Sequence, residues 1–317
     1  MPPKDRRLIK IIFAVLILLL LFGSTKHLAK LKSAKTLNLA DRFLSMGQGA
    51  RKIADGQPYG RQPRQMLDIW APATAIGPLP VVIFYYGGGW ENGNRADYGF
   101  VGRALAAQGF LVVIPDYSLT PKAHFPDFVE DCALAAAWMQ EHAAAFGGDP
   151  ARIALLGHSA GAYNAAMIAL DDQWMRRAGG NAHALRGVAT LAGPFDFLPM
   201  TKGGQAERAM GRYRPLTRTQ PINFVRPDAP PFWLASGADD EMVAARNSKV
   251  MAAALQDVGA AATLLLYPNL NHAGILMALA QPFRGKGDIL QDVTVFLKQA
   301  TAPHSVSAAP PINLERL

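Results

Sequence analysis

The chain has 317 residues, half of them hydrophobic, and a formal net charge of +8. This length is sufficient for one large α/β domain with a single core. Residues 1–35 carry eight basic residues against one acid, Asp5, so the rest of the chain is close to neutral and offers no nucleic-acid-binding face. The single cysteine, Cys132, excludes an intrachain disulfide and suits a small buried apolar position.

An unbroken apolar run at 11–22 follows the first basic residues. It predicts a short membrane anchor or a signal peptide. Cleavage directly after the run would leave a bulky residue at the −3 position, which favours an uncleaved anchor. We therefore expect an anchor at 1–25 and a basic tether at 26–45, with attachment to a bacterial inner membrane and a periplasmic catalytic domain. Secretion after signal cleavage is the alternative.

Short apolar runs and helix-length segments alternate through the following residues. This alternation predicts an α/β fold, with a mostly parallel sheet covered by helices on both faces. We expect the catalytic domain to span 46–300, with a small proline-rich cap at 194–229 and a disordered tail at 301–317. The predicted strands are 66–71, 81–86, 110–115, 152–157, 187–192, 231–236 and 262–267. The predicted helices are 98–108, 127–145, 160–170, 241–258 and 288–300.

Ser159 lies in the run Gly-His-Ser-Ala-Gly at 157–161, between a predicted strand and a predicted helix. A nucleophilic serine in this context sits on a strained turn that projects its oxygen at the C-terminal edge of the sheet. Glycines two residues before and after leave room for the turn. The free N–H groups at the helix start favour negative charge there. We therefore predict that Ser159 is a nucleophile.

The run Tyr-Gly-Gly-Gly-Trp at 86–90 follows another predicted strand. Acyl transfer needs N–H donors aimed at the oxygen that becomes negative, and a glycine loop lets the backbone approach that oxygen closely. The predicted oxyanion donors are the N–H groups of Gly88, Gly89 and Ala160. The side chains expected to contact the substrate are Tyr86 and Trp90.

The base should lie after a late strand, where it can reach the serine, and His272 has that position. His158 is inside the serine motif, where the turn should point it away from the serine oxygen. Three carboxylates at 239–241 follow the sixth predicted strand. We predict Asp240 as the orienting acid rather than Asp239, which suits a helix N-cap. The order serine, aspartate, histidine is that of the hydrolases with a strand–serine–helix turn.

These motifs resemble the α/β-hydrolase superfamily, and within it the small bacterial esterases and lipases that carry a His-Gly-Gly-Gly-Trp-like loop. Feruloyl esterase-like members and kynurenine formamidases are similar. The resemblance covers about 65–300 and implies an α/β-hydrolase fold. One departure is Tyr86, which stands where the family usually has histidine. This difference affects the expected loop geometry and the choice of subfamily, not the expected chemistry. Asp116 resembles a structural aspartate of the family and is left outside the triad.

The predicted function is a serine hydrolase that cleaves small, short-acyl carboxylic esters through an acyl-enzyme. An arylformamidase-type amide hydrolase is the alternative, and an inactive membrane-anchored scaffold is a remote one. The sequence lacks His-x-x-x-His spacing and cysteine clusters, so neither a metal nor another cofactor is expected. The expected partners are a small-molecule ester and, through the N-terminal segment, a membrane.

Overall fold

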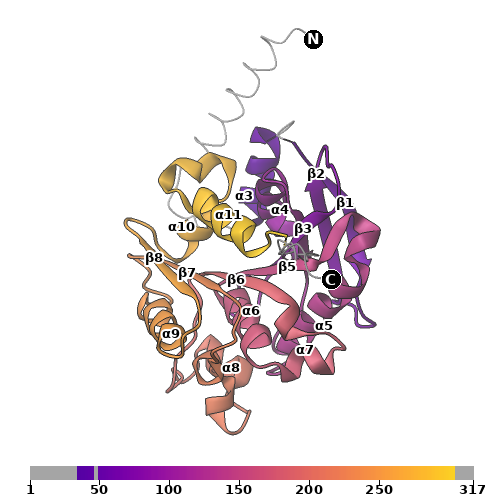
Figure 1. Cartoon of the computed structure of the whole chain (residues 1–317). Coiled ribbons are helices and arrows are strands. Elements are labelled where there is room, and N and C mark those ends of the chain that lie inside the picture. Colours follow the sequence, from indigo (N-terminus) through magenta and orange to yellow (C-terminus); the bar gives the residue numbers. More distant parts are fainter. Residues whose placement is uncertain (1–33, 46–48, 304–317) are drawn as a thin grey trace, which may run out of the picture.

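A mixed sheet of eight strands forms the centre of the computed structural model, which describes residues 34–45 and 49–303 (Figure 1). The strand order is β1-β2-β4-β3-β5-β6-β7-β8. β2 pairs antiparallel with β1 and β4, and the remaining pairs are parallel. The strands are β1 Ala50–Pro58, β2 Met66–Pro72, β3 Leu79–Tyr85, β4 Leu111–Pro115, β5 Gly148–His158, β6 Leu185–Leu191, β7 Phe232–Gly237 and β8 Ala262–Tyr267.

The seven strands expected from the apolar runs are all present, and they form the sheet from β2 to β8. Every residue of β4 is buried, as are nearly all residues of β3. Such strands are apolar on both faces because helices cover both sides of the sheet. β1 was not expected from the sequence. It is a polar edge strand that pairs only with β2, so it needs no apolar pattern.

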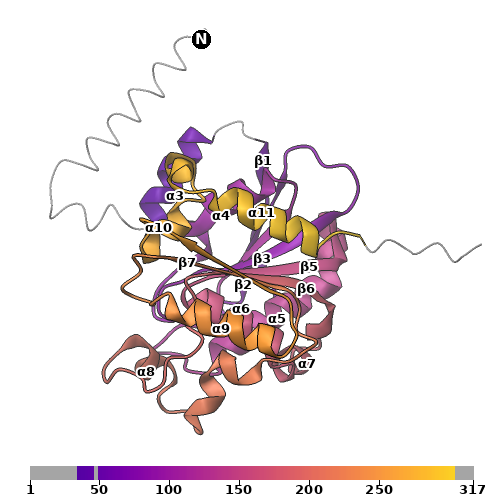
Figure 2. The same cartoon turned by 60° about the vertical axis from the view of Figure 1, so that its left-hand side comes forward.

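Helices cover both faces of the sheet, with β-strands between them (Figure 2). α4 (Gly99–Ala106) and α11 (Ile289–Ala300) lie on one face, where they contact β2, β4 and β6. α5 (Asp127–His142), α6 (Ala160–Leu170) and α9 (Arg246–Asp257) lie on the other face. All residues of α6 are buried, because α6 packs between the sheet and α5. The sheet of mostly parallel strands and its two helical layers confirm the expected α/β architecture.

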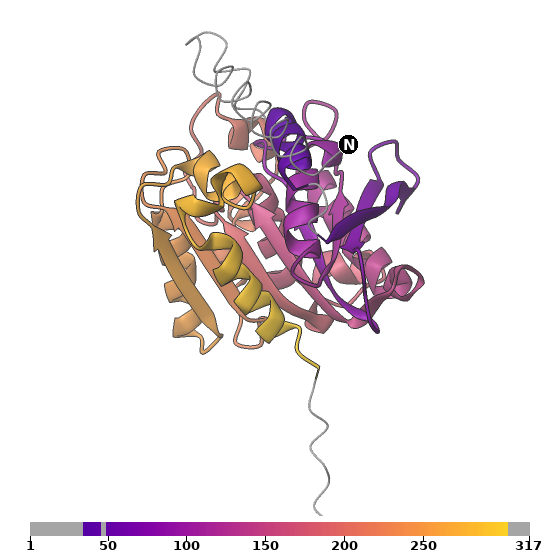
Figure 3. The ribbon, with the colours of Figure 1, turned by 90° about the horizontal axis from the view of Figure 1, so that it is seen from above.

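A helix, α3 (Ala34–Leu44), occupies most of the described part of the expected tether. It contacts α4 and the two short helices η1 (Arg95–Tyr98) and η6 (Gln281–Lys286). Figure 3 shows α3 at the same end of the sheet as α10 (His272–Met277), opposite the end at which α11 finishes. The part of the tether from residue 34 on is therefore an integral helix of the domain.

Short helices complete the described chain. The expected cap, 194–229, contains α8 and two single-turn helices. Thr301, which the sequence assigns to the tail, is buried, and its carbonyl accepts from Arg152 Nε at 2.6 Å. The remaining helices are α7 Gln173–Arg177, α8 Gln205–Met210, η2 Ala143–Phe146, η3 Ala182–Ala184, η4 Leu216–Thr219 and η5 Pro221–Phe224.

The expected anchor at 1–25 lies outside the described residues, as do the first part of the tether and the tail beyond 303. Within residues 34–45 and 49–303, no helix combines the length and apolarity that a bilayer crossing requires.

Candidate active site

Ser159 lies on a sharp turn between β5 and α6. Its backbone has φ 54° and ψ −123°, a conformation that costs a residue with a side chain on the order of 1–3 kcal/mol. The turn is possible because Gly161 has no side chain: a Cβ there would lie 2.0 Å from the carbonyl oxygen of Tyr85. A Cβ at Gly157 would likewise lie 2.4 Å from the Gly161 oxygen. The motif therefore folds into the strained strand-to-helix turn that its glycines predict.

The structure brings Ser159, His272 and Asp240 together in one hydrogen-bonded row. His272 Nε2 lies 2.8 Å from Ser159 Oγ, and His272 Nδ1 lies 2.8 Å from Asp240 Oδ2. Asp240 follows β7, and His272 is the first residue of α10 rather than a loop residue. Asn271 caps that helix, because its side chain accepts from the N–H of Gly274. This cap holds the histidine at the C-terminal edge of the sheet.

Asp240 is placed to orient the histidine as a carboxylate. Burial raises its pKa, but the hydrogen bond with His272 and the N–H groups of Val243 and Met242 outweigh burial and hold the pKa below its ordinary value. Asp240 is buried, whereas Asp239 is exposed and has no such contacts. The geometry thus distinguishes the two aspartates in favour of Asp240.

His158 reaches the backbone of the candidate base. Its Nε2 donates to the carbonyl oxygen of His272 at 2.9 Å. Burial, followed by the proximity of His272, lowers the pKa of His158 to about 3. A neutral imidazole therefore lies beside the candidate base, with the centroids of the two rings 4.9 Å apart.

The glycine loop after β3 presents backbone N–H groups beside Ser159. Gly88 has φ 134°, which favours glycine, and its carbonyl turns back to accept from the N–H groups of Glu91 and Asn92. In the described part of the chain, no backbone hydrogen bond is donated by the N–H groups of Gly88, Gly89 and Ala160. Gly88 and Gly89 line the same pocket as Ser159, and Ala160 directly follows the serine, so these three groups have the composition of an oxyanion hole.

Tyr86 and Trp90 brace this loop from inside the core. The exposed fractions are 0% for Tyr86 and 3% for Trp90, and neither side chain lines the pocket. The Tyr86 hydroxyl donates to Asp116 Oδ1 at 2.6 Å, and Trp90 Nε1 donates to Asn164 Oδ1 at 3.2 Å. This placement corrects the expected substrate contacts: both aromatic side chains turn inward because their polar atoms have buried partners there.

Tyr86, at the position where the resemblance implies a histidine, has its own bracing network. Arg64 Nη2 donates to the Tyr86 hydroxyl at 2.8 Å and to the carbonyl of Gly93 at 3.0 Å. Arg95 Nη1 contacts Asp116 Oδ2 at 2.7 Å. Asp116 thus contacts Tyr86 at the start of the glycine loop and Arg95 beyond its end, which agrees with the structural role expected for it.

A pocket of about 310 Å³ opens over Ser159. Sequence reasoning missed the contribution of α3 and of Gln205 in the cap, because both come from segments with no motif. Its lining residues are Ala34, Leu37, Gly87, Gly88, Gly89, Asn92, Tyr98, Phe100, His158, Ser159, Gln205, Met242, His272, Ala273, Leu276 and Met277.

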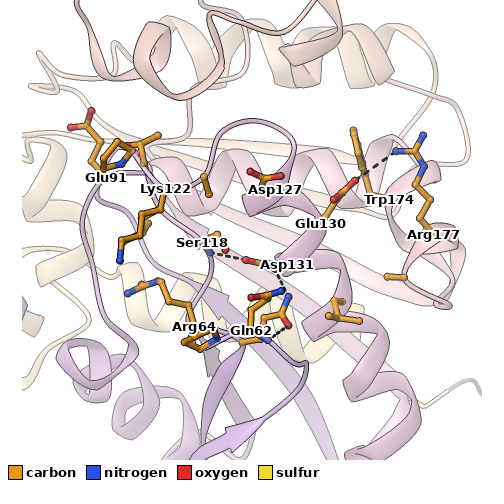
Figure 4. A pocket seen from close by; sticks show the side chains of 18 residues that line it. Gln62, Arg64, Glu91, Ser118, Lys122, Asp127, Glu130, Asp131, Trp174 and Arg177 are labelled. Carbon is orange, nitrogen blue, oxygen red and sulfur yellow. Dashed lines mark hydrogen bonds and ion pairs between the residues drawn. The ribbon is translucent and has the colours of Figure 1, made fainter.

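A larger hollow, of about 940 Å³, lies between the loop after β4 and the first turns of α5 (Figure 4). It mixes acidic and basic side chains, and Asp131 at its floor is already bonded to Ser118 and Gln65. None of its lining residues belongs to the Ser159 row. Size alone therefore does not mark the active site, and the smaller pocket carries the reactive groups. The charged side chains of the hollow are Arg64, Glu91, Lys122, Asp127, Glu130, Asp131 and Arg177.

No cluster of three or more histidine, cysteine or acidic side chains suited to a metal ion occurs among residues 34–45 and 49–303.

The sheet order, the strained serine and the hydrogen-bonded row define the α/β-hydrolase fold. Solved structures agree. A truncated carbohydrate esterase from gut microbiota has a TM-score of 0.69 at 20% identity, covering 80% of this chain and 96% of that one. Esterase B from Lactobacillus rhamnosis has a TM-score of 0.68 at 21% identity, covering 80% of this chain and 85% of that one.

A model of the BD-FAE family matches residues 67–255, which is more than half of the chain. The chain therefore belongs to the BD-FAE family.

Two curated relatives are similar over most of the chain. The probable isoprenylcysteine alpha-carbonyl methylesterase ICMEL1 of Arabidopsis thaliana is 30% identical over 262 residues, which are 75% of this chain and 55% of the relative. Esterase LipQ of Mycobacterium tuberculosis is 34% identical over 241 residues, which are 70% of this chain and 57% of the relative. The chain thus spans less than two thirds of the length of either relative.

Proposed function

We propose that this protein hydrolyses carboxylic esters through Ser159, His272 and Asp240. The observation that carries the proposal is the continuous row of two 2.8 Å contacts from serine to histidine to aspartate, in a pocket that Gly88 and Gly89 also line. Membership of the BD-FAE family and the esterase names of the curated relatives support an ester as the substrate.

In this proposal Ser159 Oγ attacks the carbonyl carbon while His272 Nε2 accepts the serine proton. Asp240 accepts from His272 Nδ1 and stabilises the imidazolium. The N–H groups of Gly88, Gly89 and Ala160 bind the oxyanion of the tetrahedral intermediate. His272 then protonates the departing alcohol, and an acyl-enzyme remains. A water molecule, deprotonated by His272, attacks the acyl carbon; His272 then returns that proton to Ser159 Oγ as the bond between serine and acyl group breaks, which releases the acid and restores Ser159.

The pocket size favours small substrates. A volume of about 310 Å³ is at the lower end of the range for small-molecule sites, roughly 300–1,000 Å³. We therefore propose short-acyl esters as the substrates. No feature of the pocket favours a formyl anilide, so the arylformamidase alternative serves only as a comparison substrate.

Hydrolysis of p-nitrophenyl acetate and butyrate by the wild type and by Ser159→Ala tests this proposal. We expect the variant to lose at least about 10⁴-fold in kcat, because the nucleophile is absent. We also expect a fluorophosphonate probe to label the wild type and not the variant. A formyl anilide assayed in parallel should be turned over more slowly. Equal ester hydrolysis by the two proteins would refute the assignment.

We further propose that the apolar run at 11–22 attaches the enzyme to a membrane. The support is in the sequence: twelve consecutive apolar residues with basic residues before them.

A further inference from the structure

Apolar side chains from three helices line the pocket over Ser159. Leu37 of α3, Phe100 of α4 and Leu276 of α10 are buried lining residues, and Ala34 of α3 and Met277 of α10 also line the pocket. Three helices that are far apart in the sequence therefore contribute apolar side chains to the lining.

No Asp, Glu, Lys or Arg side chain lines this pocket in the described part of the chain. The two histidines at its floor are the candidate base and His158, and burial lowers the pKa of His158 to about 3, so its ring is uncharged. A charged group on the substrate would lose water here without gaining an ionic partner, which is unfavourable. An uncharged apolar chain would instead be stabilised by transfer out of water.

The helix α3 is held firmly enough to act as a wall. Asp41 is fully buried, and Arg103 Nε donates to its Oδ2 at 2.7 Å, while the N–H of Gln281 donates to its Oδ1 at 2.8 Å. Asn38 on the same helix accepts from Arg103 and donates to the carbonyl of Ala96 at 2.7 Å. These bonds tie α3 to α4, η1 and η6, so Leu37 has a defined position against the pocket.

Two leucines on α3 point in opposite directions. Leu37 is 8% exposed and lines the pocket, whereas Leu39 is 56% exposed. Two residues apart on a helix corresponds to a rotation of about 200°, so the two side chains lie on opposite faces. Substitutions of Leu39 are therefore matched controls for substitutions of Leu37.

We propose that α3, α4 and α10 form a subsite for an uncharged apolar chain of the ester, and that Leu37 sets the length of chain that fits. The inference rests on the proposed ester hydrolysis and narrows its substrate class to esters with a linear apolar chain on the side of the pocket lined by α3. The chain belongs either to the acyl group or to the alcohol, and both have the same chemistry in this subsite.

The test compares kcat/KM across two ester series for Leu37→Ala, Leu37→Trp and the wild type. One series varies the acyl group from p-nitrophenyl acetate to octanoate, and the other varies the alcohol from ethyl acetate to octyl acetate. The quantity compared is the ratio of kcat/KM for the longest ester of a series to kcat/KM for the shortest. We expect Leu37→Trp to lower this ratio by roughly tenfold in one series, because one methylene of substrate gained or lost in an apolar pocket changes kcat/KM by about that factor or more. We expect Leu37→Ala to raise it. The series that responds identifies which part of the ester occupies the subsite.

Leu39→Ala and Leu39→Trp are the matched controls, and we expect them to keep the wild-type ratio in both series. The inference is overturned if both Leu37 variants keep that ratio in both series, or if the Leu39 variants change it equally. These results remain separate from the proposed function. Loss of ester hydrolysis in Ser159→Ala with unchanged ratios in the Leu37 variants would refute the subsite alone, whereas an active Ser159→Ala would refute the hydrolase.

Discussion

His158 lines the pocket but takes no part in the proposed proton transfers. Its Nε2–H is committed to the carbonyl of His272, and its buried Nδ1 has no hydrogen-bond partner among the described residues. Burial and then the proximity of His272 lower its pKa to about 3, although Asp240 acts in the opposite direction. An unfolded histidine has a pKa of about 6.5. Below that pH the unfolded chain binds a proton that the folded chain does not.

Protonation of the unfolded chain should therefore make the free energy of unfolding decrease as the pH falls from about 6.5 to about 3, by up to ~1.4 kcal/mol per pH unit from this group. His158→Gln removes the group, and we expect the pH dependence of urea unfolding between about pH 4.5 and 6.5 to weaken by about 1 kcal/mol per unit. The same slope in the wild type and in His158→Gln would contradict this assignment.

The turn between β5 and α6 depends on the close approach of α6 to β3. Gly161 is the second residue of α6, and its backbone packs directly against the carbonyls of Tyr85 and Tyr86. An alanine would favour the helix by about 1 kcal/mol through its propensity. Its Cβ, however, would lie 2.0 Å from a backbone oxygen that cannot rotate away. The steric term outweighs the propensity term, so glycine is required here.

We expect Gly161→Ala to destabilise the domain by more than about 3 kcal/mol or to prevent folding, as measured by thermal unfolding and soluble yield. Gly285→Ala is the control, because no atom lies within 4 Å of the Cβ that it would add. That variant should stay within about 0.5 kcal/mol of the wild type. A folded and fully active Gly161→Ala would show that the turn is not packed as described.

At the scale of the whole molecule, the sequence predicted the elements that are determined by neighbouring residues in the chain. Apolar runs predicted the strands from β2 to β8, and the motif and chain order predicted the three residues that meet at Ser159. β1 has no apolar run because it is an edge strand. The inward turn of Tyr86 was not predictable, because its partner Asp116 lies at the end of another strand.

The packing of helix α3 depends on residues that are distant in the sequence. Its buried residues are Leu37, Ala40 and Asp41, and a buried aspartate is unfavourable without a partner. That partner is Arg103, 62 residues further along the chain, so a local pattern of basic and apolar residues indicated a tether instead. The contacts of α3 show that the folded domain includes Ala34–Leu44, which the sequence had indicated as part of a tether.

Two truncations test the place of α3 in the domain. Removal of residues 1–33 keeps α3 and its contacts with Arg103, so we expect the melting temperature of the wild type and, given the proposed attachment, a shift from the membrane fraction to the soluble fraction. Removal of residues 1–45 leaves Arg103 without Asp41, and loss of one partner of a buried ion pair costs about 3–5 kcal/mol. We therefore expect its melting temperature to fall by roughly 10 °C. Equal melting temperatures for the two truncated proteins, measured by circular dichroism, would show that α3 is dispensable to the domain.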